Sequence, residues 1–146
     1  SRYDFDLSAG TDEFYLDPTY YDYEFKSRKA DVNWYVVHYL NSKFGVLELG
    51  VGSGRIALPA VRKGAHVHGV DLSKKMLQQA RSHREKLPVS KQDALQLHQA
   101  DMREFDLEKK FDLVTIPFNA FMHLYTLSDV DRCLTCVQKH LRVGTS

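Results

Sequence analysis

The sequence predicts an α/β protein built on a doubly wound parallel sheet. Three observations carry this prediction: short apolar runs suited to buried strands, intervening segments with apolar residues at helical spacing, and acidic residues where the strands end. The expected strands are Val46–Leu49, Ala65–Val70, Leu95–Gln99 and Phe111–Ile116. A chain of 146 residues suffices for one such domain, and it contains no internal repeat.

The first expected strand runs into a turn that holds three alternating glycines. Gly50, Gly52 and Gly54 follow the apolar run, and the apolar positions from Ile56 to Val61 suit a helix that packs back on the sheet. Glycine permits a sharp turn and a close approach of the backbone to a ligand, and the start of a helix offers free N–H groups. The order of strand, glycine turn and helix therefore predicts a nucleotide-like cofactor.

Two residues of this turn disfavour a dinucleotide. The dinucleotide pattern is G-x-G-x-x-G, whereas this chain carries Arg55 where the last glycine would fall. Glu48, near the end of the strand, would repel a pyrophosphate but suits a ligand with a positive charge. A sulfonium amino acid therefore fits the turn better than a diphosphate.

Further acids follow the second and third expected strands. Asp71 lies about twenty residues beyond Gly52, where doubly wound folds place the acid that accepts from ribose hydroxyls. Ser73 is expected to cap the next helix, in which Met76 takes core spacing. The third strand leads into Ala100-Asp101-Met102-Arg103. Each acid alone could serve a turn or a cap, but all of them fall at the carboxyl ends of expected strands, which form the ligand-binding edge of an open sheet.

Together these motifs resemble the class I S-adenosylmethionine-dependent methyltransferases, over roughly residues 20 to 142. An acid before G-x-G-x-G resembles the family's first motif, D-L-S-x-x-M-L its second and A-D-M-R its adenine-reading motif. The resemblance implies a Rossmann-like sheet with four strands in the order 3-2-1-4, and S-adenosylmethionine as the cofactor. It places Asp71 on the ribose, Leu72 on adenine, and Asp101 on the adenine amino group. The cofactor-binding residues expected on this basis are Tyr21, Glu48, Gly50, Gly52, Arg55, Asp71, Leu72, Met76, Asp101, Met102, Pro117 and Phe118.

The run after the fourth strand indicates the kind of acceptor. Pro117-Phe118-Asn119, followed by His123-Leu124, resembles the small-molecule branch of the family, in which such a run lines the active-site floor. Base-methylating and amide-methylating relatives carry an N-P-P-Y-like run there, from which this chain departs. We therefore expect methyl transfer to a small N or O acceptor, by positioning and exclusion of water and with no metal. The candidate catalytic residues are Tyr21, Asn119 and His123. His123 could act as a base, or it could equally lie on a helix surface or contact the site residues from behind.

The first twenty-five residues are rich in aromatic and acidic side chains. They could fold over the ligand as a lid, or equally pack on the sheet as an arm. Tyr21 lies in a D-P-x-x-Y-D run that resembles one in the family, which would place it above the methionine end of the cofactor. Helical spacing predicts a helix over 31–40. We expect a single domain over 1–146, with lid and helix in 1–42 and the core in 43–146.

Composition excludes other classes of protein. The net charge is +1 and no face is obviously basic, so nucleic acid is not the expected substrate. No apolar run is long enough to span a membrane, and no signal-peptide pattern occurs. Cys133, Cys136 and His140 suggest zinc, but no second cysteine pair follows, and Cys133 fits the apolar stripe of a helix expected to start at Ser128. Two reduced thiols suit a cytoplasmic protein.

Chains of the resembling family continue beyond the last expected helix, which ends near Leu141. This chain is therefore expected to be a fragment or a shortened core that lacks the strands after the fourth. Its fourth strand would be an exposed edge, which could pair with a second copy of the chain or be covered by the lid or the last helix, unless the chain is only part of the working protein. One alternative is a non-catalytic S-adenosylmethionine-binding or partner module. A less favoured one is an NAD-dependent oxidoreductase, which Glu48, Arg55 and the Asp101-Met102 pair disfavour.

Overall fold

The computed structural model describes residues 32–117, 120 and 124–142. The chain divides into the units Ser1–Trp34 and Tyr35–Ser146, and the sheet lies in the second unit. No helix within these described ranges combines the length and the apolar character needed to cross a membrane. Residues 32–40 are helical, and the elements that follow are β1 (Val46–Leu49), α2 (Ala57–Arg62), β2 (Val67–Asp71), α3 (Lys74–Arg84), α4 (Val89–Gln92), β3 (Leu95–Gln99), β4 (Leu113–Thr115) and α6 (Leu127–His140).

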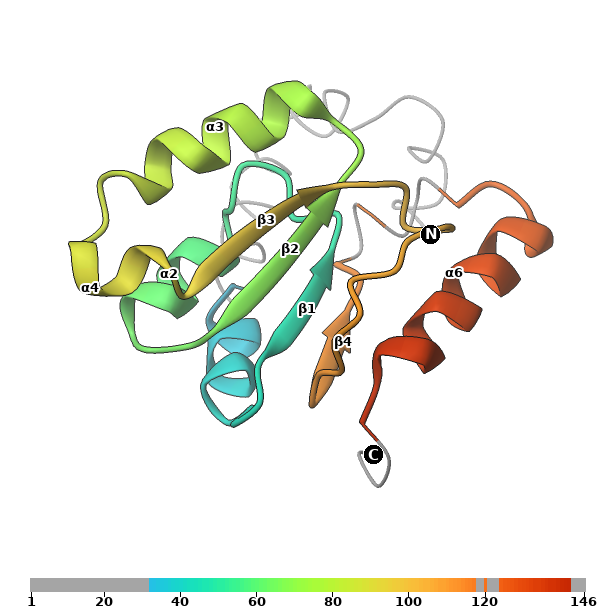
Figure 1. Ribbon diagram of the computed structural model, residues 1–146, viewed down its shortest axis with the longest axis horizontal. Coiled ribbons are helices and arrows are strands. Elements are labelled where there is room, and N and C mark those ends of the chain that lie inside the picture. Colours follow the sequence, from blue (N-terminus) through green and yellow to red (C-terminus); the bar gives the residue numbers. More distant parts are fainter. Residues whose placement is uncertain (1–31, 118–119, 121–123, 143–146) are drawn as a thin grey trace, which may run out of the picture. The chain divides into compact units, whose positions relative to one another are not determined.

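The strands form one parallel sheet in the order β3-β2-β1-β4, which confirms the predicted topology (Figure 1). Val46 of β1 lies opposite Val67 of β2 on one side and opposite Leu113 of β4 on the other. Because β1 is an inner strand with helices over the sheet, all of its residues are buried, and its apolar side chains follow one another without alternation. Parallel pairing brings the carboxyl ends of the strands to one edge of the sheet.

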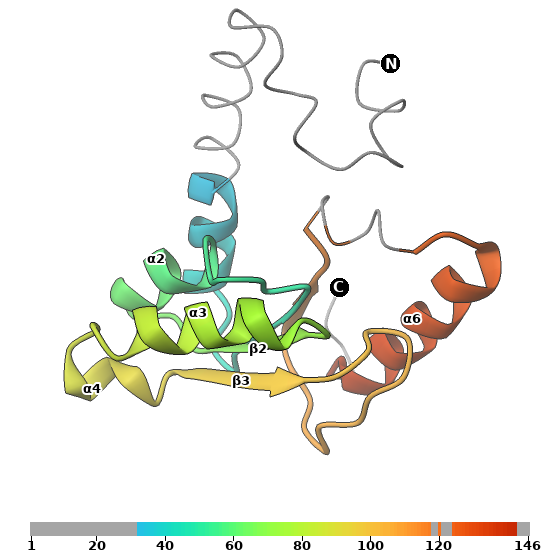
Figure 2. The same ribbon diagram turned by 90° about the horizontal axis from the view of Figure 1, so that it is seen from above.

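Helices cover both faces of this sheet. α2 and α3 contact β2 and β3, and α6 lies apart from them on the other side (Figures 1 and 2). Cys133 of α6 joins Leu47 and Leu49 of β1 in one apolar cluster. Successive strand residues point to opposite faces, so Glu48 points away from α6 and instead meets Tyr39 at the end of helical residues 32–40. The arrangement is the expected doubly wound one.

Both long helices of the core begin at side-chain caps, one of them where the sequence predicts it. The Ser73 hydroxyl oxygen accepts the Met76 N–H at 3.2 Å, which starts α3 as expected. α6 begins earlier than the predicted Ser128, because Thr126 is the cap and its hydroxyl oxygen accepts the Asp129 N–H at 3.0 Å. Both caps satisfy N–H groups that the first helical turn leaves without helical partners. The prediction for α6 was wrong because Ser128 offers a similar cap pattern in the sequence.

The fourth strand is shorter than predicted, and the start of its edge is covered. β4 spans only Leu113–Thr115, while Phe111 forms an isolated parallel bridge with Leu141. The Phe111 N–H donates to the His140 carbonyl at 2.7 Å, and the Arg142 N–H donates to the Phe111 carbonyl at 3.0 Å. Backbone at the end of α6 and just after it therefore lies beside the beginning of the predicted strand, before β4 itself starts. Association of two copies through the remainder of β4 stays a prediction.

Candidate functional site

A cavity of about 630 Å³ lies at the carboxyl ends of β1, β2 and β3. A second cavity of about 730 Å³ surrounds the beginnings of strands at the opposite end of the sheet, with Lys43, His66 and Lys109 among its lining. Ligands of open α/β sheets bind outside the carboxyl ends of the strands, so the first cavity is the candidate site. Its lining residues are Gly50, Gly52, Val70, Asp71, Leu72, Ser73, Met76, Ala100, Asp101, Met102, Arg103, Ala120, Leu124 and Tyr125.

The glycine turn forms one wall of this cavity. The N–H groups of Gly50 and Val51 donate to the Val70 carbonyl at 2.6 and 3.0 Å, which fixes the turn against the end of β2. Gly50 has φ +80°, and a Cβ on it would lie 2.1 Å from the Ala120 Cβ. Gly52 has φ +59°, and a Cβ on it would lie 3.4 Å from the Met76 Cε. A Cβ on Gly50 would clash with Ala120, so glycine is required there. A Cβ on Gly52 would make an ordinary contact with Met76, but it would add a methyl group to the wall in a backbone conformation that favours glycine.

Asp71 joins the glycine turn to the start of α3. Its Oδ2 accepts the Gly52 N–H at 2.8 Å, and its Oδ1 accepts the Ser73 N–H at 2.8 Å. An ionised carboxylate can accept about four hydrogen bonds, so each oxygen keeps capacity for a further donor. Asp71 is therefore both a brace for the turn and an available acceptor at the cavity, which suits the ribose role expected for it.

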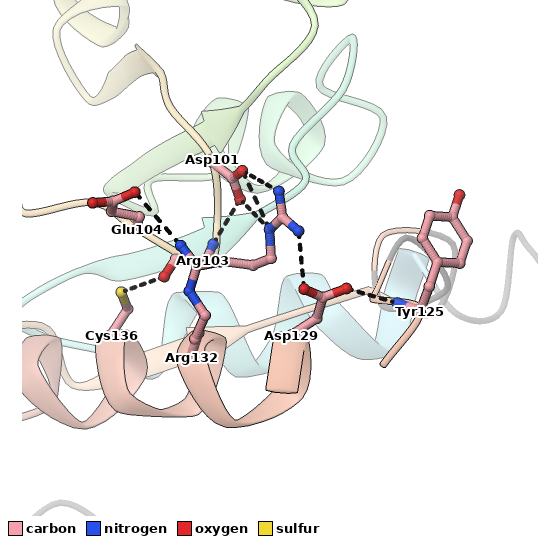
Figure 3. Close-up of polar contacts among 7 residues, drawn as sticks. All are labelled: Asp101, Arg103, Glu104, Tyr125, Asp129, Arg132 and Cys136. Atoms are coloured by element: carbon pink, nitrogen blue, oxygen red, sulfur yellow. Dashed lines mark hydrogen bonds and ion pairs between the residues drawn. The ribbon is translucent and has the colours of Figure 1, made fainter. Parts of the chain in front are cut away.

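Asp101 lies on the wall that follows β3, held by the guanidinium of Arg103 (Figure 3). Arg103 Nη2 donates to Asp101 Oδ2 at 2.7 Å, and Arg103 Nε donates to Asp101 Oδ1 at 3.0 Å. These bonds lower the pKa of Asp101 to about 2, so its carboxylate is ionised at neutral pH. The neighbouring Met102 lines the same wall. The expected acceptor for an adenine amino group is thus at the cavity and negatively charged.

Apolar side chains are exposed around the cavity. Leu72 is 64% exposed and Met76 is 38% exposed, although both are apolar and both line it. Exposed apolar side chains that gather beside polar acceptors often mark a ligand site. Leu72 and Met76 could therefore pack against a flat, weakly polar ring. A sugar attached to that ring would then lie near the Asp71 carboxylate.

Glu48 lies beneath the glycine turn and is not among the residues that line the cavity. It is 1% exposed, and its Oε1 accepts the Tyr39 hydroxyl at 2.6 Å. The Tyr39 oxygen also lies 2.7 Å from the Thr115 hydroxyl oxygen, so three side chains form one chain of hydrogen bonds from the buried Glu48 to the half-buried Thr115. Burial raises the pKa of Glu48 to about 8, while the bond from Tyr39 and the positive charge of Arg55 act against that rise. Burial and the neighbouring acid raise the pKa of Tyr39 as well.

The remaining expected site residues fall into two groups. Arg55 is exposed and Pro117 is half-buried, and neither lines the cavity. Direct contact of Glu48, Arg55 or Pro117 with a cofactor therefore stays a prediction. Tyr21, Phe118, Asn119 and His123 lie outside the described residues, so their roles also remain predictions.

Several residues at the cavity carried no predicted role. Arg103 stands inside the A-D-M-R run, but sequence reasoning assigned functions only to the two residues before it. Tyr125 lines the cavity from the segment before α6, next to Leu124, which ends the run predicted to line the active-site floor. Asp129 accepts the Tyr125 N–H at 3.3 Å. Only the spacing of Asp129 after Thr126, which is that of a helix cap, could have indicated this connection from the sequence.

The Cys133, Cys136 and His140 group is part of the fold. Cys133 is buried in the core, and burial raises the pKa of its thiol to about 11. His140 is buried too, with Nδ1 at 2.6 Å from the Cys136 carbonyl and Nε2 accepting the Leu107 N–H at 3.0 Å. One neutral tautomer, with the proton on Nδ1, satisfies both bonds. In the described part of the chain, no group of three or more His, Cys, Asp and Glu side chains is placed to hold a metal ion.

Comparison with known proteins identifies the family. Residues 46–144 match the family described as the methyltransferase domain. The dTDP-3-amino-3,4,6-trideoxy-alpha-D-glucopyranose N,N-dimethyltransferase of Streptomyces venezuelae is 31% identical over 99 residues, which are 68% of this chain and 38% of that protein.

Solved structures of methyltransferases share the fold. The glycopeptide N-methyltransferase MtfA, complexed with S-adenosylmethionine, superimposes with a TM-score of 0.72 at 28% identity, over 78% of this chain and 50% of that chain. CalS10, an amino pentose methyltransferase from Micromonospora echinaspora, gives a TM-score of 0.64 at 28% identity, over 90% of this chain and 54% of that chain. The chain thus spans about half the length of these structures and 38% of the curated relative. On this match and on its fold, the chain belongs to the methyltransferase domain family and has the Rossmann-like core of the class I S-adenosylmethionine-dependent methyltransferases.

Proposed function

We propose that this chain binds S-adenosylmethionine in the 630 Å³ cavity and forms the cofactor-binding part of an enzyme that methylates a small molecule. One observation carries the proposal: a glycine turn and two carboxylates, which come from three different strand ends, line the same cavity. Gly52, Asp71 and Asp101 are far apart in the sequence, and the parallel sheet brings them to one edge.

The chemistry of the lining fits this cofactor part by part. Gly50 and Gly52 leave the wall free of side chains where an amino-acid portion could approach the backbone. Asp71 can accept from the two ribose hydroxyls, and Asp101 can accept from the adenine amino group. Leu72 and Met76 offer apolar surface to the base. The volume lies within the range typical of cofactor cavities.

Nitrogen is the favoured acceptor atom, with oxygen as the second possibility. The relatives above are named as an N,N-dimethyltransferase, a glycopeptide N-methyltransferase and an amino pentose methyltransferase. S-adenosylmethionine, when bound, supplies an activated methyl group on a sulfonium. The protein's part is to hold the two reactants in line and exclude water, and Tyr21, Asn119 and His123 remain the residues proposed to contact the acceptor.

Paired glycine variants test the cofactor site. Gly52 and Gly64 both have positive φ, of +59° and +115°, but a Cβ on Gly64 would meet nothing within 4 Å. Gly52→Ala adds less backbone strain than Gly64→Ala, because φ +59° lies in the left-handed region that other residues can adopt and φ +115° does not; only Gly52→Ala places a methyl group at the cavity wall. We expect Gly52→Ala to weaken binding of S-adenosylmethionine and S-adenosylhomocysteine by roughly tenfold or more in calorimetry, and Gly64→Ala to leave it near the wild-type value.

Two outcomes would contradict this proposal. If the two folded variants bind S-adenosylmethionine with equal affinity, the glycine turn is not part of the binding site. Saturable binding of NAD in competition with S-adenosylmethionine would instead favour the oxidoreductase alternative. Formation of S-adenosylhomocysteine with amino sugars and other small amines would show methyl transfer by this chain itself, whereas binding without turnover is expected both of a cofactor-binding part and of a non-catalytic binding module. The cytoplasmic location and the absence of nucleic-acid substrates stay predictions from composition.

A further inference from the structure

Arg103 connects two walls of the candidate cavity (Figure 3). On one side it holds Asp101, on the wall that follows β3. On the other side its Nη1 donates to Asp129 Oδ1 at 2.9 Å, at the start of α6. A single guanidinium therefore contacts both the wall predicted to face adenine and α6, the helix that follows the run predicted to line the active-site floor.

The contact with Asp101 fixes the direction of that carboxylate. Asp101 Oδ1 accepts both the Arg103 backbone N–H at 2.9 Å and Arg103 Nε at 3.0 Å. Asp101 Oδ2 accepts Arg103 Nη2 at 2.7 Å, with Nε at a longer 3.2 Å. The fork and the backbone together restrict rotation of the carboxylate. The Nε–H is shared between its two oxygens, so three N–H groups occupy about four acceptor positions and the carboxylate keeps capacity for one further donor.

The contact with Asp129 extends the constraint to the other wall. Asp129 Oδ2 accepts the Tyr125 N–H at 3.3 Å, and Tyr125 lines the cavity. The hydrogen bond from Arg103, together with those from the Tyr125 backbone and Thr126, lowers the pKa of Asp129, so this carboxylate is ionised at neutral pH. The Arg103 carbonyl oxygen is in turn 3.5 Å from Cys136 Sγ, which ties the same residue to the middle of α6.

A neighbouring ion pair provides a contrast. Arg132 Nη2 lies 3.5 Å from Glu104 Oε2, and the Glu104 side chain is 84% exposed. Such a pair in solvent contributes little to structure. Arg103 differs, because it makes forked contacts to one carboxylate and a separate contact to a second, and both acids are half-buried.

We propose that Arg103 is a positioning residue that sets the base specificity of the cofactor site, by fixing the Asp101 carboxylate for the adenine amino group and linking it to the wall that holds Tyr125. This inference rests on the proposed function, because it requires an adenosyl ligand in the cavity. Arg103 acts through Asp101. A lysine at this position would keep the charge but could not form the fork and the contact to Asp129 together.

Base discrimination tests the proposal, using S-adenosylhomocysteine and S-inosylhomocysteine as probes. The inosyl compound carries a 6-oxo group in place of the 6-amino group, so it presents an acceptor to Asp101 where the adenosyl compound presents a donor. Calorimetry gives the ratio of the two affinities for the wild-type chain, Arg103→Lys and the control Arg132→Lys, with thermal unfolding measured alongside. We expect Arg103→Lys to reduce the preference for the adenosyl compound by about fivefold or more, and Arg132→Lys to leave it unchanged.

Other results distinguish a failure of the proposed cofactor site from a failure of the role proposed for Arg103. A wild-type chain that binds neither compound overturns the proposed function, and the role of Arg103 with it. A wild-type chain that prefers the adenosyl compound, with the same preference in folded Arg103→Lys, overturns the role of Arg103 alone. If Arg103→Lys weakens the binding of both compounds by the same factor, Arg103 only supports the fold. Should Arg103→Lys fail to fold, Asp129→Asn removes the second anchor while keeping an oxygen for the Tyr125 N–H, and it should reduce the same preference in the same direction.

Discussion

Replacement of Asp71 by asparagine separates binding of the ribose from support of the glycine turn. The two carboxylate oxygens accept the Gly52 and Ser73 N–H groups, each at 2.8 Å. Asparagine has a single acceptor oxygen, so Asp71→Asn keeps the size of the side chain but leaves one of these donors without its partner. The negative charge that would strengthen hydrogen bonds to ribose hydroxyls is lost as well.

The size of the effect follows from the number of bonds affected. A hydrogen bond to a charged group contributes about 1.5–3 kcal/mol, and the half-buried position of Asp71 favours the lower part of that range. We therefore expect binding of S-adenosylhomocysteine to weaken by about 1–2 kcal/mol, which is roughly 5- to 30-fold. The free energy of unfolding without ligand should fall by about 1 kcal/mol, because one N–H group of the turn or of α3 loses its acceptor.

Calorimetric titration measures the first quantity, and urea unfolding measures the second. Asp93→Asn serves as the control, because Asp93 is an exposed acid just before β3 and does not line the cavity. Unchanged affinity in a folded Asp71→Asn variant would refute the ribose assignment. A loss of affinity no larger than that of Asp93→Asn would have the same meaning.

Two further predictions concern buried polar groups. Glu48→Gln should flatten the pH dependence of the free energy of unfolding. The pKa of Glu48 is about 8 in the folded chain and has an ordinary value of 4.5, so as the pH rises the unfolded state loses this proton first. In the wild-type chain the free energy of unfolding therefore falls as pH rises from about 4.5 to 8, and the variant lacks this contribution. Urea unfolding at several pH values checks this, and an identical slope in the variant would show that Glu48 does not titrate in that window. His140→Ala should lower the free energy of unfolding by roughly 2–5 kcal/mol, because the Leu107 N–H and a carbonyl of α6 both lose a buried partner. A loss below about 1 kcal/mol, close to that of the exposed Gln138→Ala, would contradict this role of the ring.

The sheet could be predicted from the sequence because its strands are marked by local patterns. β1 and β3 have the expected bounds, since Gly50 directly follows β1 and the Ala100-Asp101 run directly follows β3. β4 was predicted too long, because Phe111 and Ile116 are apolar like the strand itself although only Leu113–Thr115 pair with β1. Apolar character indicates burial rather than strand pairing: Phe111 is buried, but among the described residues its one strand-like pairing is the bridge with Leu141.

The cavity was predictable where single residues carry recognisable chemistry at strand ends. Gly50, Gly52, Asp71 and Asp101 all line it. Glu48 shows what such reasoning leaves open: its charge suggested contact with a cation, which stays a prediction, and the sequence did not indicate that its side chain is buried against Tyr39. Helical spacing predicted the helix that carries Tyr39, but no local pattern indicates which residue its hydroxyl will meet.

Contacts between distant segments were beyond the reach of local patterns. The link from Arg103 to Asp129 depends on how α6 lies against the sheet, and the two residues are separated by 26 positions. Similarly, the ring of His140 meets the Leu107 N–H across 33 positions. Such bonds follow from tertiary packing, so the sequence shows the residues but not their partners.

The central claim, that the cofactor binds at the carboxyl ends of the strands, is tested most directly by titrating ¹⁵N-labelled chain with S-adenosylhomocysteine and following the amide signals by NMR. We expect saturable shifts at Gly50, Gly52, Asp71 and Asp101, with little change at Lys43 and Lys109 around the opposite cavity. Shifts confined to Lys43, Lys109 and their neighbours, or no saturable shift in a folded sample, would contradict the account.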